Sequence, residues 1–164
     1  MSEIAHKGPH MFIWGVLLVM AVLPVIWIGG EHFYFHSALP LMVLVGKWFV
    51  FWAAGIRLFS AGLVKLVRPQ FTTEGIFGIE SRDALPFVRE LGAGNLAMGF
   101  VGIASLAKPS FVLPVAVAAA LFYGIAGVRH AADKGRTLNQ NIAMISDLFV
   151  FLVLVAYVGY VALA

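Results

Sequence analysis

The stretch that decides the fold is IAMISDLFVFLVLVAYVGYVAL, residues 142–163. Its single charged residue is Asp147, and most of the remaining side chains are apolar. An α-helix that crosses the hydrocarbon core of a bilayer needs about 20 such residues. The stretch is therefore predicted to be a transmembrane helix, and an acidic residue inside it requires a partner or a role.

Further apolar runs of similar length precede this one, at about residues 11–29, 39–67, 86–106 and 111–130. The 164-residue chain is 62% hydrophobic and 12% charged, whereas soluble domains average about 45–50% apolar and about 25% charged residues. We predict an all-α integral membrane protein: one transmembrane domain over residues 1–164, a bundle of about five transmembrane helices, multi-pass in the cell membrane. Pro24 should kink the first helix unless its neighbours satisfy the freed carbonyl. A signal peptide is the alternative for this run, but the apolar core is too long for one.

The basic residues predict the orientation, because cytoplasmic flanks of membrane helices collect Lys and Arg. If the N-terminus is cytoplasmic, only Lys108 lies outside. Lys47 lies within the second run, near enough to the outer surface for its ammonium group to snorkel. We expect membrane lipid, and no nucleic acid, as the partner of this charge. The residues assigned to the cytoplasmic side are Lys7, Lys65, Arg68, Arg82, Arg89, Arg129, Lys134 and Arg136.

Arg57, Glu90, Asn95 and Asp147 lie within the predicted helices. At a rise of ~1.5 Å per residue, all four belong to the cytoplasmic half of the bilayer. A charge at the centre of a membrane helix costs about 2.5–3.5 kcal/mol, so pairing is expected: Arg57 with Asp147 or Glu90, and Asn95 as a neutral bridge.

Three more polar residues lie at or near the inner ends of their helices and extend this set: Tyr123, His130 and Asn141. Together the seven side chains predict a polar pocket in the inner leaflet. The alternative is an ion-pair network that serves only the structure.

Small residues predict close helix packing around the pocket. Gly99 and Gly102 share a face of the third run, and Ala116, Ala120 and Gly124 repeat every four residues on the fourth. The loop QFTTEGIFGIE, residues 70–80, mixes polar and apolar residues, and its two threonines could cap a short helix. This segment is predicted either to cover the mouth of the pocket or to be a plain linker.

Few motifs in the sequence point to a cofactor or a metal ion. Cysteine is absent, so thiolate chemistry and iron–sulfur clusters are excluded, and no nucleotide, dinucleotide, serine-hydrolase or zincin motif occurs. The cofactor therefore stays unknown. His6 and His10, like His32 and His36, have a spacing that can hold a metal, but the aromatic residues around the second pair favour a membrane-interface belt. No metal site is predicted.

Several segments resemble the DoxX-like superfamily of small four-helix membrane proteins, in an uncharacterised bacterial branch. They are GIRLFSAGLVKLVRP (55–69), FVRELGAGNLAMGFVGIASL (87–106), LFYGIAGVRHA (121–131) and NIAMISDLFVF (141–151). The similarity covers roughly residues 50–160. It implies a compact antiparallel four-helix core to which the first helix is added, and its motif positions match Arg57, Glu90, Asn95, His130 and Asp147. Members are variously described as redox-linked accessory subunits, assembly factors and cargo receptors.

Three functions are compatible with these features. The first is a non-enzymatic accessory subunit of a membrane protein partner, or a binder of a lipid-like or quinone-like small molecule. The second is an intramembrane enzyme that uses Glu90, Asp147 and His130 for acid–base chemistry on a lipophilic substrate. The third is a small channel or proton-coupled carrier. We expect the first.

Overall fold

The computed structural model describes residues 8–75 and 78–164, and all regular elements in these ranges are helical. The predicted all-α class is confirmed. The α-helices are α1 (Gly8–Leu17), α2 (Leu23–Gly29), α3 (Leu41–Phe49), α4 (Arg57–Val67), α5 (Pro69–Gly75), α6 (Leu85–Ala104), α7 (Val112–Ala132) and α8 (Leu138–Leu163). The other turns are π-helical η1 (Leu18–Val22), η2 (Gly30–Tyr34) and η3 (Val50–Ile56), and 3₁₀-helical η4 (Arg82–Ala84) and η5 (Pro109–Phe111).

Within the described ranges, 4 helices are long and apolar enough to cross a membrane: Ile13–Tyr34, Leu41–Val67, Pro109–Ala132 and Leu138–Leu163. They correspond to four of the predicted runs. The first continues to Tyr34 because η2 extends it past Gly29. The last begins at Leu138 because the Thr137 side chain accepts a hydrogen bond from the Gln140 N–H, while the Gln140 side-chain oxygen accepts one from the Thr137 N–H.

The remaining predicted run, residues 86–106, forms helix α6, which is not among these four. Its length of 20 residues is sufficient to span. Arg89, Glu90, Asn95 and its glycines lower its mean hydropathy. Composition alone therefore does not mark α6 as a span.

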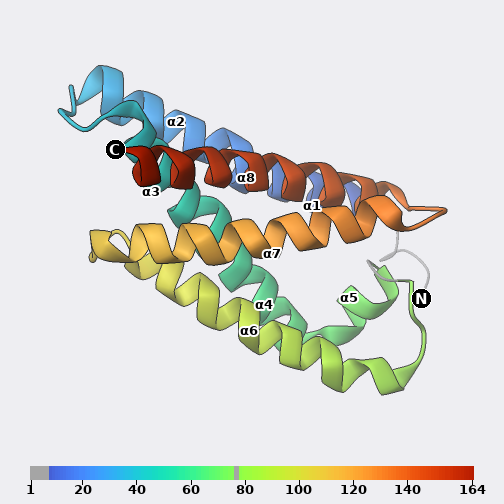
Figure 1. The fold of residues 1–164 in the computed structure, drawn as a ribbon. Helices are drawn as coiled ribbons and strands as arrows, with labels where there is room; N and C mark the ends of the chain where they lie inside the picture. The colour runs from blue at the N-terminus through green and yellow to red at the C-terminus, as the bar shows by residue number, and fades with distance from the viewer. Residues whose placement is uncertain (1–7, 76–77) are drawn as a thin grey trace.

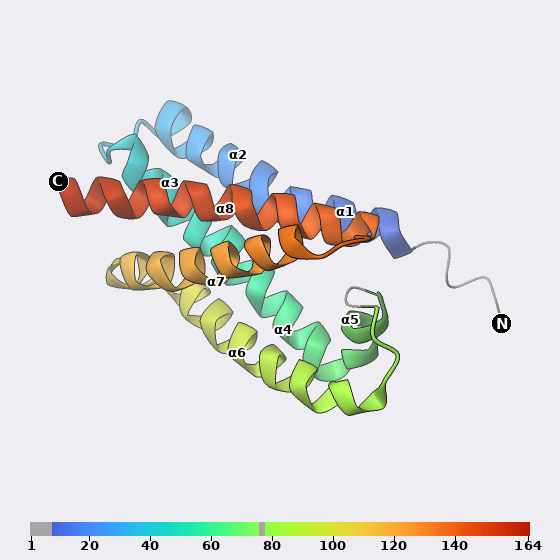
Figure 2. The same cartoon turned by 45° about the vertical axis from the view of Figure 1, so that its right-hand side comes forward.

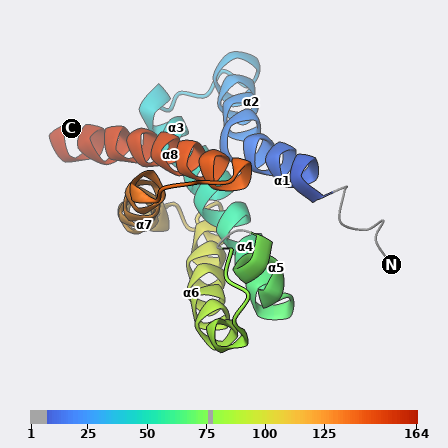
Figure 3. The ribbon, with the colours of Figure 1, turned by 90° about the vertical axis from the view of Figure 1, so that its right-hand side faces the viewer.

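The long helices run between two ends of the molecule (Figure 1). Helices α7 and α8 lie side by side and antiparallel, and α6 lies along α4 (Figures 1 and 2). One end carries α5 and the connector between α7 and α8; the opposite end carries the α2–α3 and α6–α7 connectors and the C-terminus. The end-on view places α4, α5 and α6 to one side of the α7–α8 pair, and α1 and α2 to the other (Figure 3).

Pro24 lies in the first turn of α2, directly after the wider turn η1. A proline inside an α-helix clashes with the carbonyl four residues earlier and cannot donate to it. In η1 the Leu23 N–H instead bonds to the Leu18 oxygen, five residues back. This π-helical turn lets the helix continue through the proline, which is the compensation that the sequence required.

Glycines bring α6 into backbone contact with η3 and α4, which agrees with the close approach that the spacing of Gly99 and Gly102 predicted. A Cβ atom built on Gly62 would stand 2.5 Å from the Leu96 nitrogen, and one on Gly102 would stand 2.7 Å from the Gly55 Cα. One on Gly99 would overlap the backbone of Phe59. The two helices can approach this closely only because these positions lack side chains.

Ala116, Ala120 and Gly124 also pack as predicted. Both alanines are buried, at 0% and 6% relative exposure, and Gly124 faces the Phe151 ring of α8. Gly127, one turn further, faces Leu148 of the same helix. The small residues of α7 thus set its contacts with the rest of the bundle.

Candidate functional site

A cavity of about 370 Å³ lies among α4, α5, α6, α7 and α8. We call it the polar cavity. Five of the seven predicted site residues line it: Arg57, Asn95, Tyr123, His130 and Asp147. Its remaining wall is mostly apolar, with Leu58, Leu91, Phe122 and Ile125 among the lining residues. A mostly apolar hollow with a few converging polar groups is the usual form of a small-molecule site.

Tyr123 is fixed by the π-helical turn η3. Its side chain is 2% exposed, and its hydroxyl donates a hydrogen bond of 2.5 Å to the Ala53 carbonyl. Ala53 lies within η3, where the wider winding displaces carbonyls from regular α-helical bonding. Arg57 follows this turn at the start of α4. The turn therefore helps to position both side chains at the cavity.

Asn95 lies on the face of α6 that contains Gly92 and Gly99, which we call the glycine face. Gly92, three residues before it, and Gly99, four residues after it, both contact α4. Asn95 lies on the same side and is 3% exposed. The close approach of the two helices thus holds an amide group in the cavity wall, which explains why an asparagine lies among glycines in this helix.

Cations outnumber carboxylates in the wall. Asp147 lies within electrostatic range of both Arg57 and Lys65, and Arg129 also lines the cavity. The expected convergence of Arg57 with Asp147 is therefore present, and it includes a lysine. Lys65 and Arg129 had been assigned only to the cytoplasmic flank. The spacing Arg57–Ala61–Lys65, four residues each, is the signal that could have identified Lys65, because such residues share a helix face.

Glu90 does not belong to the site. Its side chain is exposed, and it does not line the polar cavity. The buried face of α6 runs through Val88, Gly92, Asn95 and Gly99, so Glu90 points to another side of the helix. The expectation that Glu90 joins this cluster was wrong.

Asn141 is also displaced from the predicted pocket. Its side-chain oxygen accepts a hydrogen bond of 2.9 Å from Arg136 Nε. Arg136 Nη1 also donates to the carbonyls of Ala131 and Asp133, at 2.8 and 2.6 Å. Asn141 therefore helps to hold the connector between α7 and α8, because it lies in the first turn of α8.

The loop after the second span forms the short helix α5, whose Thr72 lines the polar cavity. This part of the loop therefore contributes to the cavity wall, whereas residues 76–77 of the same loop lie outside the described ranges. That the loop covers the mouth of the pocket stays a prediction. The threonines do not cap α5 at its start. Thr73 Oγ1 instead donates to the carbonyls of Pro69 and Gln70, at 3.3 and 3.2 Å.

A second polar cluster lies near the opposite end. Lys47 Nζ contacts both carboxylate oxygens of Glu31 at 2.8 Å, and Trp48 Nε1 donates to Glu31 at 2.7 Å. Trp27 stacks on Trp48 with ring centroids 4.7 Å apart. Lys47 thus forms an ion pair with a carboxylate of the preceding span, which was not predicted from the sequence. Its snorkelling to the outer surface stays a prediction.

The structure describes only some of the histidines considered for metal binding. His6 and the side chain of His10 lie outside the described parts of the structure. His32 packs edge-on against Phe33, with ring centroids 4.8 Å apart, beside the exposed rings of Tyr34 and Phe35. In the ranges described, His, Asp and Glu form no group of three that could hold a metal ion.

Comparison with known proteins gives one match. A family model described as "Family of unknown function (DUF6790)" matches residues 10–164. No protein with a curated description matches the chain, and no solved structure matches it. The resemblance to the DoxX-like superfamily stays a prediction. Because the match covers nearly the entire chain, the protein belongs to the DUF6790 family.

Proposed function

We propose that the protein crosses the cell membrane five times with its N-terminus in the cytoplasm. Helix α6 supports a fifth span, since it follows α4 from one end of the molecule to the other. The distribution of charge supports the orientation. Arg68, Arg82, Lys134 and Arg136 all lie in connectors at the end that carries α5, whereas Lys108 lies in the α6–α7 connector at the opposite end.

Within this topology, we propose that the protein is a non-enzymatic binder of a lipid-like or quinone-like molecule, alone or as an accessory subunit of a membrane protein. The observation that carries this function is the polar cavity, in which an amide, a phenol, an imidazole, a carboxylate and basic groups meet beside an apolar wall. The apolar wall would hold a hydrocarbon skeleton. The polar groups would bind a carbonyl or hydroxyl head.

Replacing Asp147 by asparagine tests this function. The substitution keeps the size of the side chain and removes its charge. We expect about a tenfold loss of the lipophilic molecule that copurifies with the full-length protein, since a hydrogen bond to a charged group contributes about 1.5–3 kcal/mol. The protein is purified from membranes in mild detergent, extracted with organic solvent, and the extract is quantified by mass spectrometry per mole of protein.

Glu90→Gln is the matched control, because it removes a carboxylate that lies outside the cavity. It should leave the copurified amount unchanged. If wild-type protein carries only the lipids of the bulk membrane, in their bulk proportions, or if both variants behave alike, the binding function is refuted.

Acid–base catalysis is the second candidate, because His130 and Asp147 both line the polar cavity. These two groups would transfer protons on a bound lipophilic substrate. Glu90, the third residue considered for this role, lies elsewhere. Incubation of the copurified molecule with wild-type protein, followed by mass spectrometry, separates the candidates: an unchanged mass favours binding, and a changed mass that requires both side chains favours catalysis.

A further inference from the structure

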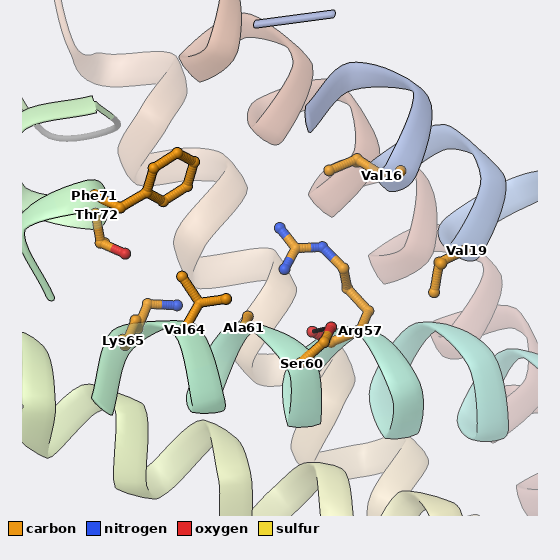
Figure 4. Close-up of a pocket in the computed structure, with 10 residues that line it drawn as sticks. Val16, Val19, Arg57, Ser60, Ala61, Val64, Lys65, Phe71 and Thr72 are labelled. Atoms are coloured by element: carbon orange, nitrogen blue, oxygen red, sulfur yellow. Dashed lines mark hydrogen bonds between the residues drawn. The ribbon is translucent and has the colours of Figure 1, made fainter. Parts of the chain in front are cut away.

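A second cavity, of about 270 Å³, adjoins the polar cavity on the side of α1 and α5. We call it the α1–α4 cavity. Arg57, Ala61, Lys65 and Thr72 line both cavities, so these residues form a shared wall. Figure 4 shows the α1–α4 cavity, with Val16 of α1 and Val19 of η1 facing α4 across it.

The head groups of Arg57 and Lys65 enter this cavity from its two ends. In Figure 4 the guanidinium of Arg57 and the ammonium of Lys65 are directed toward the same space, and the Thr72 hydroxyl lies beside Lys65. No acidic side chain is among the described residues that line this cavity. The space between the two cations is therefore suited to an anion.

The electrostatics point the same way. Arg57 and Lys65 act on each other as like charges. Asp147, a carboxylate that acts on both, lines the other cavity. An anion placed between two cations in a region of low dielectric constant is attracted by both.

The surroundings indicate an amphiphilic anion. Lys65 lies two residues before the end of α4, which is about 3 Å along the helix axis. In a membrane-spanning α4, this position is at the depth of the lipid head groups. Val16, Val19 and Phe71 offer apolar contacts next to the cations. Ser60 and Val64 are exposed on α4, so the cavity opens sideways on the surface that faces lipid.

We propose that the α1–α4 cavity binds the phosphate group of an anionic phospholipid. Arg57 and Lys65 supply the positive charges that balance the phosphate, and the acyl chains of the lipid lie along α1 and Phe71. Guanidinium and ammonium groups are the usual partners of phosphate oxygens. Thr72 supplies a hydroxyl at the same place. This site goes beyond the function proposed for the polar cavity and does not require that cavity to be occupied.

The test is lipid binding by the purified full chain in dodecyl maltoside, measured by native mass spectrometry. Dioleoyl phosphatidylglycerol and dioleoyl phosphatidylcholine are titrated separately, because they share acyl chains and differ in net charge. We expect the protein to prefer phosphatidylglycerol. Lys65→Met should lower the affinity for phosphatidylglycerol about tenfold and leave the affinity for phosphatidylcholine unchanged, because one charge-assisted contact is lost.

Lys134→Met is the matched control, because it removes a lysine at the same end of the molecule that lines neither cavity. It should retain the preference, and so should Lys65→Arg, which keeps the charge. If Lys65→Met does not fold, Thr72→Val tests the same wall and should weaken phosphatidylglycerol binding.

Equal affinity for the two lipids in wild type, or equal losses in Lys65→Met and Lys134→Met, would overturn the proposal. Displacement of phosphatidylglycerol by millimolar inorganic phosphate would assign the site to a soluble anion and overturn the lipid as its source. Asn95→Leu separates this site from the polar cavity, because Asn95 lines only that cavity. It should lose the copurified molecule of the polar cavity and keep the preference for phosphatidylglycerol.

Discussion

Gly99→Ala is expected to destabilise the protein by about 1–3 kcal/mol, and Gly99→Leu is expected to prevent folding. The added Cβ would overlap the Phe59 backbone of α4. A backbone cannot rotate away as a side chain does, so α4 and α6 would have to separate. Separation would also withdraw Asn95 from the polar cavity. Thermal unfolding in detergent, followed by circular dichroism, measures the change.

Gly94→Ala is the control for this prediction. Gly94 lies on the same helix, five residues away, and a Cβ there meets nothing within 4 Å. Alanine is the better helix former by about 1 kcal/mol, so this variant should be as stable as wild type or slightly more so. A similar loss of stability in both variants would mean that helix α6 does not pack on α4 through the glycine face.

Tyr123→Phe is expected to destabilise the bundle by about 1–3 kcal/mol, although it removes a single oxygen atom. That oxygen donates to the Ala53 carbonyl in the π-helical turn η3. Ala53 is 0% exposed, so its carbonyl would be left buried without the lost donor. We also expect weaker retention of the copurified molecule, because Tyr123 lines the polar cavity and η3 leads directly to Arg57.

The matched variant is Tyr160→Phe, which removes the same atom from an exposed side chain near the C-terminal end of α8. Its unfolding temperature should stay close to that of wild type. Should Tyr123→Phe also unfold at the wild-type temperature, the bond to Ala53 would not contribute to the stability of the bundle.

Much of this fold could be predicted from the sequence, because the bilayer leaves few alternatives. Runs of about 20 apolar residues can cross it only as helices that satisfy their own backbone groups. The small residues predicted that the third and fourth runs pack closely against other helices, but not which helices these are. The π-helical turns were not predictable, since they compensate for local features such as Pro24 that pattern alone does not resolve.

A residue of the candidate site could be predicted only where its position on the helix places a polar side chain on the face that lines the cavity. Glu90 did not meet this condition. Glu90 and Asn95 are five residues apart, which places them about 140° apart around a helix, so they could not both face one pocket. Lys65 was missed because the bias of cytoplasmic flanks toward basic residues explained it without a second role. The Glu31–Lys47 pair joins two different spans, and the sequence contains no signal of which helices become neighbours.

Cysteine accessibility tests the central claim, that polar residues of several helices line one cavity reached from the end of the molecule that carries α5, the end proposed to face the cytoplasm. The natural chain contains no cysteine, so a single substitution gives a single reactive site. Ala126 lines the polar cavity, whereas Val128 is 63% exposed on another face of α7 and lines neither cavity. In inside-out vesicles, a membrane-impermeant thiosulfonate should label Ala126→Cys faster than Val128→Cys, although Val128 lies nearer the end of the molecule that carries α5. Labelling that depends only on distance from that end, with Val128→Cys the faster, would contradict the account.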